Sequence, residues 1–157
     1  IDKVQRSVFS FSKISFDYNN NKWVLDESLD IERNKLILSE NYRELKSMKI
    51  KSNDQVIEFK YLDNKNQFDF ESIFDNVGFS SLFPKPKNIL YEGLVNGKIS
   101  LKKDGDLYTS ESSLIINDFS SNGYLLGDAL IDINNSISRD KYDLAVKIVN
   151  KENFSNA

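Results

Sequence analysis

The sequence contains no cysteine and no histidine among its 157 residues. Without cysteine, the chain forms neither a disulfide nor a thiolate metal site. Without histidine, it lacks the imidazole that catalytic triads and most zinc sites require. Proteins of oxidising and of reducing compartments can both lack cysteine, so this absence does not indicate where the protein resides.

An excess of charge of one sign is also lacking. The 21 Lys and Arg and 24 Asp and Glu residues give a net charge of −3, and they are interspersed without a basic block. Neutralising nucleic-acid phosphates requires clustered Lys and Arg side chains. We therefore expect a solvated mixed-charge surface and no nucleic-acid partner.

Long hydrophobic runs are missing as well. No stretch approaches the roughly 18 apolar residues of a membrane-spanning helix. With 39% hydrophobic and 29% charged residues, the composition suits one folded domain or one slice of a repetitive one. The chain opens mid-pattern with Ile1-Asp2-Lys3 and shows no signal peptide, so we expect an excised fragment or a processed chain.

Residues with catalytic spacing are few. A Ser-x-x-Lys pair activates serine when a helix places both residues on one face, whereas a strand turns them to opposite faces. The Ser-Asp-Asn and Lys-Thr-Gly sequences that accompany such a pair in hydrolases are absent. We therefore expect no enzyme activity from the three pairs present, Ser10/Lys13, Ser100/Lys103 and Ser138/Lys141.

One acidic turn is a candidate calcium site. Asp104 and Asp106 have the carboxylates to ligate calcium together with Asp128 or another carbonyl donor. Asp-Gly-Asp is more often a simple hairpin turn in which Gly supplies a positive φ. The sequence thus predicts no metal and no cofactor.

Strict alternation of apolar and polar residues dominates the chain, and this is the pattern of β-strands. It is clearest over residues 89–101 and recurs near Ile57, Phe68 and Tyr142. Turn signals such as Asn122-Gly123 and residues 63–66 separate the runs. Strands at roughly 8–15-residue intervals predict an all-β sandwich or solenoid.

The first run contains a phase slip. Phe9 and Phe11 alternate on one face, whereas Ile14, Phe16 and Tyr18 alternate on the other. A bulge near residues 12–13 would repair the slip by adding one residue to a single strand.

Proline is scarce, with Pro84 and Pro86 the only two. They mark the best internal boundary and divide the chain into two β modules, residues 1–83 and a continuous second module, residues 84–157. Helical patterns are weak, although residues 72–82 have room for one short helical turn before Pro84.

The second module carries a family resemblance. A glycine-punctuated strand at residues 93–101 is followed by a loop, the apolar run 112–119 and the Leu126-Gly127-Asp128-Ala129-Leu130 strand. This order resembles the TamB family of bacterial translocation and assembly proteins, in the form of Bacteroidota-type sequences. The segments near Trp23 and at residues 45–59 and 70–82 are similar to the preceding part of such proteins, apart from Lys60-Tyr61 in place of a Gly-containing strand end.

The resemblance implies a non-enzymatic, AsmA-like periplasmic protein anchored in the inner membrane. Its antiparallel strands would form a curled, taco-like groove or open sandwich with an apolar interior and little helix. The groove would bind or conduct phospholipid between the inner and outer membranes. An Omp85-type outer-membrane assembly protein would be its partner.

On this interpretation, apolar side chains of the second module line the groove and contact phospholipid acyl chains. The choice between Leu114/Ile116 and the alternating Ile115 is open from the sequence. The candidate lining residues are Tyr91, Val95, Ile99, Leu101, Leu114, Ile116, Leu126, Tyr142, Leu144, Val146 and Ile148.

Two other functions fit the same pattern. A structural or protein-interaction scaffold would pair its edge strands with outer-membrane assembly partners or adjacent repeats. A carbohydrate-binding β-sandwich would present exposed aromatic platforms, with Trp23 and several Tyr as candidates. Periodicity cannot separate these functions, because each needs one apolar face.

Overall fold

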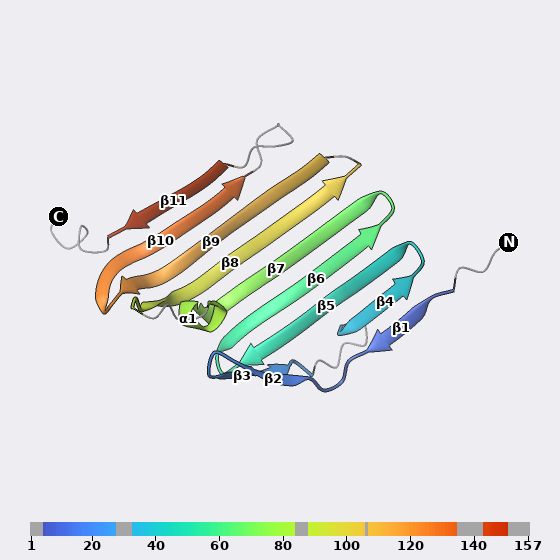
Figure 1. Ribbon diagram of the computed structural model, residues 1–157, viewed down its shortest axis with the longest axis horizontal. Helices are drawn as coiled ribbons and strands as arrows, with labels where there is room; N and C mark the ends of the chain where they lie inside the picture. Colours follow the sequence, from blue (N-terminus) through green and yellow to red (C-terminus); the bar gives the residue numbers. More distant parts are fainter. Residues whose placement is uncertain (1–4, 28–32, 84–87, 106, 135–142, 151–157) are drawn as a thin grey trace.

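The chain folds as one open, antiparallel β-sheet, which confirms the all-β expectation (Figure 1). The computed structural model describes residues 5–27, 33–83, 88–105, 107–134 and 143–150. In these residues, eleven strands follow the order β1-β4-β5-β6-β7-β8-β9-β10-β11, with β3 beside β5 and β2 beside β3. The strands are β1 (Ser7–Ser10), β2 (Ser15–Tyr18), β3 (Asn21–Leu25), β4 (Lys35–Ser39), β5 (Tyr42–Ser52), β6 (Gln55–Asn64), β7 (Gln67–Gly78), β8 (Tyr91–Asp104), β9 (Leu107–Ser121), β10 (Tyr124–Asn134) and β11 (Asp143–Val149).

Short turns join the long central strands into a meander. As the sequence predicts, Asn122-Gly123 connects β9 to β10, and both residues have positive φ, +50° and +80°. Two successive positive φ angles match the right-handed twist of a two-residue hairpin, which explains the choice of Asn and Gly. Asn53, with φ +53°, occupies the corresponding turn between β5 and β6.

The predicted bulge near residues 12–13 is wrong. Phe9 lies opposite Leu36 because β1 pairs with β4, whereas Phe16 lies opposite Trp23 because β2 pairs with β3. The chain therefore leaves one strand and enters another between Ser10 and Ser15. The phase changes because the two halves of the run have different partners.

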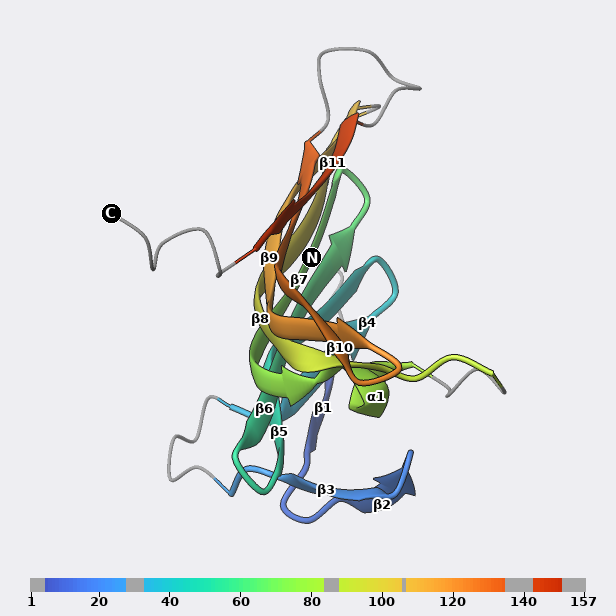
Figure 2. The ribbon, with the colours of Figure 1, turned by 90° about the vertical axis from the view of Figure 1, so that its left-hand side faces the viewer.

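The β2–β3 hairpin and the short helix α1 (Phe79–Leu82) project from the same side of the sheet (Figure 2). The expected helical turn before Pro84 is thus present. Asn19 Nδ2 donates to the carbonyl oxygens of Ser80 at 3.3 Å and Phe83 at 3.0 Å, and Asn21 Nδ2 donates to Ser81 Oγ at 3.0 Å. These bonds hold the hairpin against α1.

The buried core lies under these two elements. Trp23 on β3 is 2% exposed and Val77 on β7 is fully buried. The core is a single apolar cluster that spans the sheet from β3 to β10. Its buried members are Trp23, Leu25, Ile50, Ile57, Val77, Val95, Ile116 and Ala129.

The predicted module boundary at residues 84–87 lies outside the described residues. The strands on either side of it, β7 and β8, pair with each other from Gln67 opposite Asp104 to Gly78 opposite Leu94. Within the described part of the chain, no helix has the length and apolar composition needed to cross a membrane.

Candidate functional site

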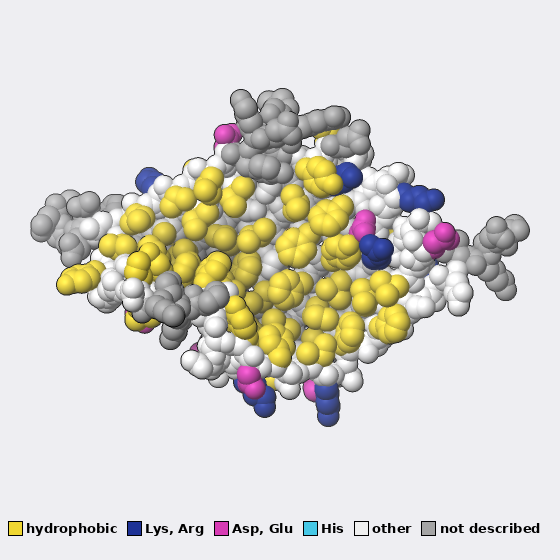
Figure 3. Space-filling view, in the orientation of Figure 1, with side chains coloured by type: hydrophobic (Ala, Val, Ile, Leu, Met, Phe, Trp, Pro, Cys, Tyr) yellow, Lys and Arg dark blue, Asp and Glu magenta, His cyan; other side chains and the backbone are white. Residues whose placement is uncertain are grey.

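The side of the sheet that carries α1 is covered with hydrophobic side chains, and we call it the apolar face (Figure 3). Because residues paired across antiparallel strands point to the same side, the strand register resolves this face into four rows. From the β11 side they are Ile148–Ala129–Ile116–Val95–Val77; Val146–Ile131–Leu114–Gly97–Phe74–Ile57–Ile50–Leu25; Leu144–Ile133–Ser112–Ile99–Ser72–Phe59–Met48; and Ser110–Leu101–Phe70–Tyr61–Leu45–Leu36–Phe9.

The exposure of this face changes along the rows. Val95 and Ile116, near α1, are 3% and 4% exposed, whereas Leu144, Val146 and Ile148 on β11 are 64%, 60% and 50% exposed. The β2–β3 hairpin and α1 therefore cover one corner, and the face opens toward β11. The four rows contain no charged side chain.

Most of the predicted lining residues share this face. Eight lie in the four rows, and Leu114 and Ile116 lie there while Ile115 pairs with Asn96 on the opposite side. Tyr91 stacks on Phe119 at the α1 end, with ring centroids 5.9 Å apart. The eight are Val95, Ile99, Leu101, Leu114, Ile116, Leu144, Val146 and Ile148.

Besides Tyr91, two other predicted residues are not placed in these rows. Leu126 lies where the register of β10 against β9 shifts between Leu125 and Gly127, and it has no Cα partner. Tyr142 lies outside the described residues. That any of these residues lines a lipid groove stays a prediction.

Sequence reasoning missed the contribution of the first module. Phe59, Tyr61 and Phe70 continue the same rows, although the candidate list began only at Tyr91. The alternation of residues 57–61 and 68–70 was the signal for them. Trp23 had no comparable signal, because its burial depends on α1 and on strands distant in the sequence.

The margin of the apolar face near the β6–β7 turn is charged. Arg43 pairs with Asp63, Nη1 to Oδ2, at 3.3 Å, in a row that continues through Phe68 to Lys103. Lys103 Nζ lies 5.0 Å from the ring centroid of Tyr108. A polar margin of this kind is suited to a ligand with one apolar and one polar end.

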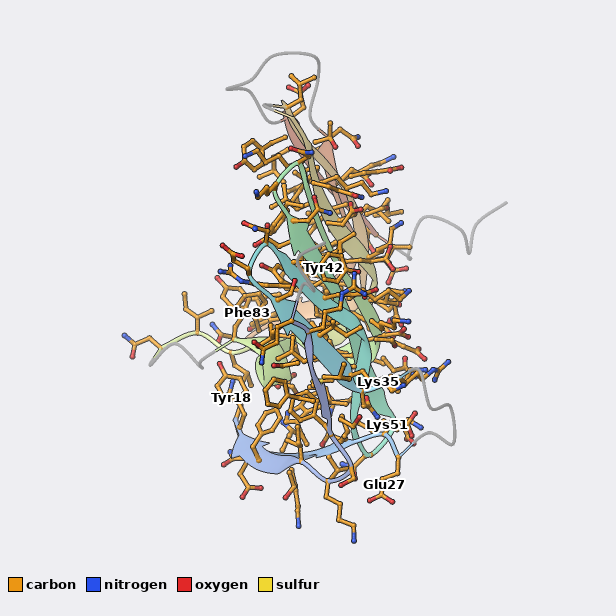
Figure 4. The ribbon with its side chains drawn as sticks, turned by 90° about the vertical axis from the view of Figure 1, so that its right-hand side faces the viewer. Tyr18, Glu27, Lys35, Tyr42, Lys51 and Phe83 are labelled. Atoms are coloured by element: carbon orange, nitrogen blue, oxygen red, sulfur yellow. The ribbon has the colours of Figure 1, made fainter. Side chains whose placement is uncertain are left out.

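The opposite side, the polar face, carries a ladder of charge pairs. Lys49 pairs with Glu58 at 3.8 Å, Lys60 with Glu71 at 3.0 Å, and Lys98 with Glu71 at 3.6 Å. The hydrogen bond from Lys60 lowers the pKa of Glu71 and, in return, raises the pKa of Lys60. Figure 4 shows Lys35 and Lys51 on this side and Tyr18 and Phe83 on the side of α1.

The structure separates the residues considered for chemistry. Ser100 pairs with Glu71 on the polar face, whereas Lys103 pairs with Phe68 on the apolar face, so this Ser-x-x-Lys pair points in opposite directions as expected. Val95 on β8 and Ala129 on β10 lie in the same row, because both pair with Ile116. Asp104 lies nine residues further along β8 than Val95, whereas Asp128 is next to Ala129, so about 30 Å separates Asp104 from Asp128. The suggested calcium site with Asp128 is therefore wrong.

No cluster of three or more potential metal-ligating side chains occurs among the described residues. Of the other candidates, Asp106, Ser138 and Lys141 lie outside those residues. Ser10 ends β1 and Lys13 lies in the segment between β1 and β2, so this Ser-x-x-Lys pair is not on a helix. What the arrangement offers chemically is a wide apolar surface with a charged margin. Comparisons with known protein families, curated proteins and solved structures found no match to this chain.

Proposed function

We propose that this chain forms one segment of a β-sheet groove whose apolar face binds phospholipid acyl chains. The observation that supports the proposal most is the separation of the two sides of the sheet. One side has four uncharged rows that reach exposed Leu144, Val146 and Ile148, and the other has the Lys–Glu ladder. A closed sandwich would bury these β11 side chains under a second layer.

The expected binding free energy of an acyl chain fits transport along the face better than long-lived storage of lipid. Burial of one methylene is worth about 0.8 kcal/mol, so about ten methylenes half buried on a one-sided face gain about 4 kcal/mol. That corresponds to a dissociation constant near 1 mM. Weak contact distributed over uniform rows holds a chain without fixing it, which permits sliding along the face.

The resemblance to the TamB family adds a location, a transport role and a partner to this proposal. The segment belongs to a larger periplasmic protein anchored in the inner membrane, which conducts phospholipid to the outer membrane. An Omp85-type protein is the proposed outer-membrane partner. The charged margin at Arg43 and Lys103 would face the headgroup while the acyl chains lie on the rows.

Two matched variants on β10 test the acyl-chain site. Ile133 lies on the apolar face opposite Leu144, and Leu130 lies on the polar face opposite Lys147; both are half-buried. Each is changed to Asp, folding is checked by circular dichroism and urea unfolding, and a fluorescent long-chain fatty acid is titrated. Ile133→Asp should weaken binding at least about fivefold, or about 1 kcal/mol, and Leu130→Asp should leave it unchanged. Equal effects of the two variants, or no binding by the unmodified chain, would refute the proposal.

A further inference from the structure

The sequence contains two Asn-Gly pairs, Asn122-Gly123 and Asn96-Gly97, and the structure places them in different environments. An Asn-Gly pair is chemically labile, because glycine has no side chain to shield its own backbone nitrogen. That nitrogen attacks the side-chain amide carbon of the preceding asparagine when the two atoms meet. The reaction therefore depends on how firmly the fold holds both residues.

Asn122-Gly123 is held weakly. It forms the exposed turn between β9 and β10, and a Cβ built on Gly123 would meet no atom within 4 Å. The side chain of Asn122 accepts a hydrogen bond at Oδ1 from the backbone N–H of Leu90, at 2.8 Å, and this bond is exposed. Breaking one hydrogen bond of this kind slows a reaction by roughly two- to tenfold, so the turn restrains Asn122 only slightly.

Asn96-Gly97 is held firmly in the middle of β8. Gly97 has register partners on both β7 and β9. Asn96 Oδ1 accepts a hydrogen bond from the backbone N–H of Asn76 at 2.9 Å, and its Nδ2 donates to Asn117 Oδ1 at 3.0 Å. The side chain is thus tied to both neighbouring strands. Attack by the Gly97 nitrogen requires β8 to open, and a strand paired on both sides opens rarely.

We propose that Asn122 is a site of non-enzymatic deamidation and that the sheet protects Asn96 from the same reaction. The backbone nitrogen of Gly123 loses its proton to hydroxide and bonds to Cγ of Asn122. The bond from Cγ to Nδ2 breaks, and ammonia leaves with a proton from water. Water then opens the resulting cyclic imide at either of its two carbonyl carbons, which gives aspartate or isoaspartate at position 122.

The modification changes the turn and its contact with the segment before β8. Leu90 and Asn122 are joined twice, by the bond to Oδ1 and by a bond from the Asn122 backbone N–H to the Leu90 carbonyl oxygen, each 2.8 Å long. Both products add a negative charge beside Tyr124, which is 77% exposed. Isoaspartate also adds a carbon to the main chain, so the turn no longer fits and residues 88–90 are released. None of these steps depends on the binding of acyl chains.

Peptide mapping by mass spectrometry tests both asparagines in one sample. The full chain is incubated at mildly alkaline pH, with and without urea, and the conversion of each amide to a carboxylate is followed over time. In the folded chain, Asn122 should deamidate at least about a hundredfold faster than Asn96, because only the second site waits for the sheet to open. In urea, the two sites should react at similar rates. A folded chain in which Asn122 stays intact, or in which Asn96 reacts as fast as Asn122, would overturn the proposal.

The effect on the turn is measured on the purified isoaspartate form. Its amide exchange at residues 88–90 should be at least about twofold faster than in the parent, because the bonds to position 122 are lost. Asn122→Asp is the matched control, since it carries the same charge on an unaltered main chain and keeps an oxygen that accepts from Leu90. Equal exchange in the isoaspartate form and the parent would contradict the release of this segment.

Discussion

Replacing Trp23 with alanine should release the β2–β3 hairpin from the apolar face. Trp23 is 2% exposed, and buried Trp to Ala changes cost about 3–5 kcal/mol. The other attachments of the hairpin are modest. β3 meets β5 at only two register positions, and hydrogen bonds such as that of Asn21 to Ser81 contribute about 0.5–1.5 kcal/mol each.

The loss should be local rather than global. The sheet from β5 to β10 keeps its own pairing and should stay folded. At residues 15–25, amide exchange should accelerate by roughly 10²–10³-fold, because each 1.4 kcal/mol of lost stability corresponds to a factor of ten. Hydrogen-exchange mass spectrometry measures this directly. Val24→Ala is the control, because Val24 is 40% exposed and its truncation should change protection little. Unchanged exchange at residues 15–25, or an equal loss in β6 and β8, would refute the reasoning.

Three further changes follow from single positions in the sheet. Ser72 is 1% exposed and its Oγ has no hydrogen-bond partner among the described residues, so Ser72→Ala should match or exceed the parent in urea unfolding; a loss above about 1 kcal/mol would count against this. Gly97 has φ +125° and an added Cβ would collide with the neighbouring backbone, so Gly97→Ala should lower the free energy of unfolding by more than about 2 kcal/mol. Gly123 lies at an open turn with φ +80°, so Gly123→Ala should lower it by only about 1 kcal/mol. Similar losses in the two variants would contradict the geometry. Because the pKa of Glu71 is lowered in the folded state, its ionised carboxylate stabilises the fold at pH values above the ordinary carboxyl pKa, and this stabilisation is lost as the pH falls through the lowered pKa. Glu71→Gln should therefore flatten the decline of the free energy of unfolding below about pH 4.5. A decline identical to the parent's would refute this.

The strands were predictable because their alternation is local. Residues 57–61 and 89–101 each carry a period of two, and β6 and β8 cover nearly the same ranges. The Asn122-Gly123 turn was predictable for the same reason, since its conformation is determined by two residues. Alternation alone also placed Leu144, Val146 and Ile148 on one side.

The remaining features depend on partners distant in the sequence. Nothing near Phe9 or Phe16 indicates that they pair with different strands, so one bulged strand was the simplest interpretation of their phase. The choice between Leu114 and Ile115 required knowing which side α1 and Trp23 cover. That choice follows from the register of several strands, and no single segment determines it.

The most direct test of the apolar face as an acyl-chain site is cross-linking by phospholipid with a photoactivatable group at its acyl terminus. After illumination, peptide mapping by mass spectrometry assigns the modified residues, and neighbouring residues on a strand report opposite sides of the sheet. An acyl-chain site on the apolar face predicts adducts on Ile131, Ile133, Leu144 and Val146, with little on Ile115 or Lys147. Adducts distributed equally over both sides, or concentrated at Ile115 and Lys147, would contradict it.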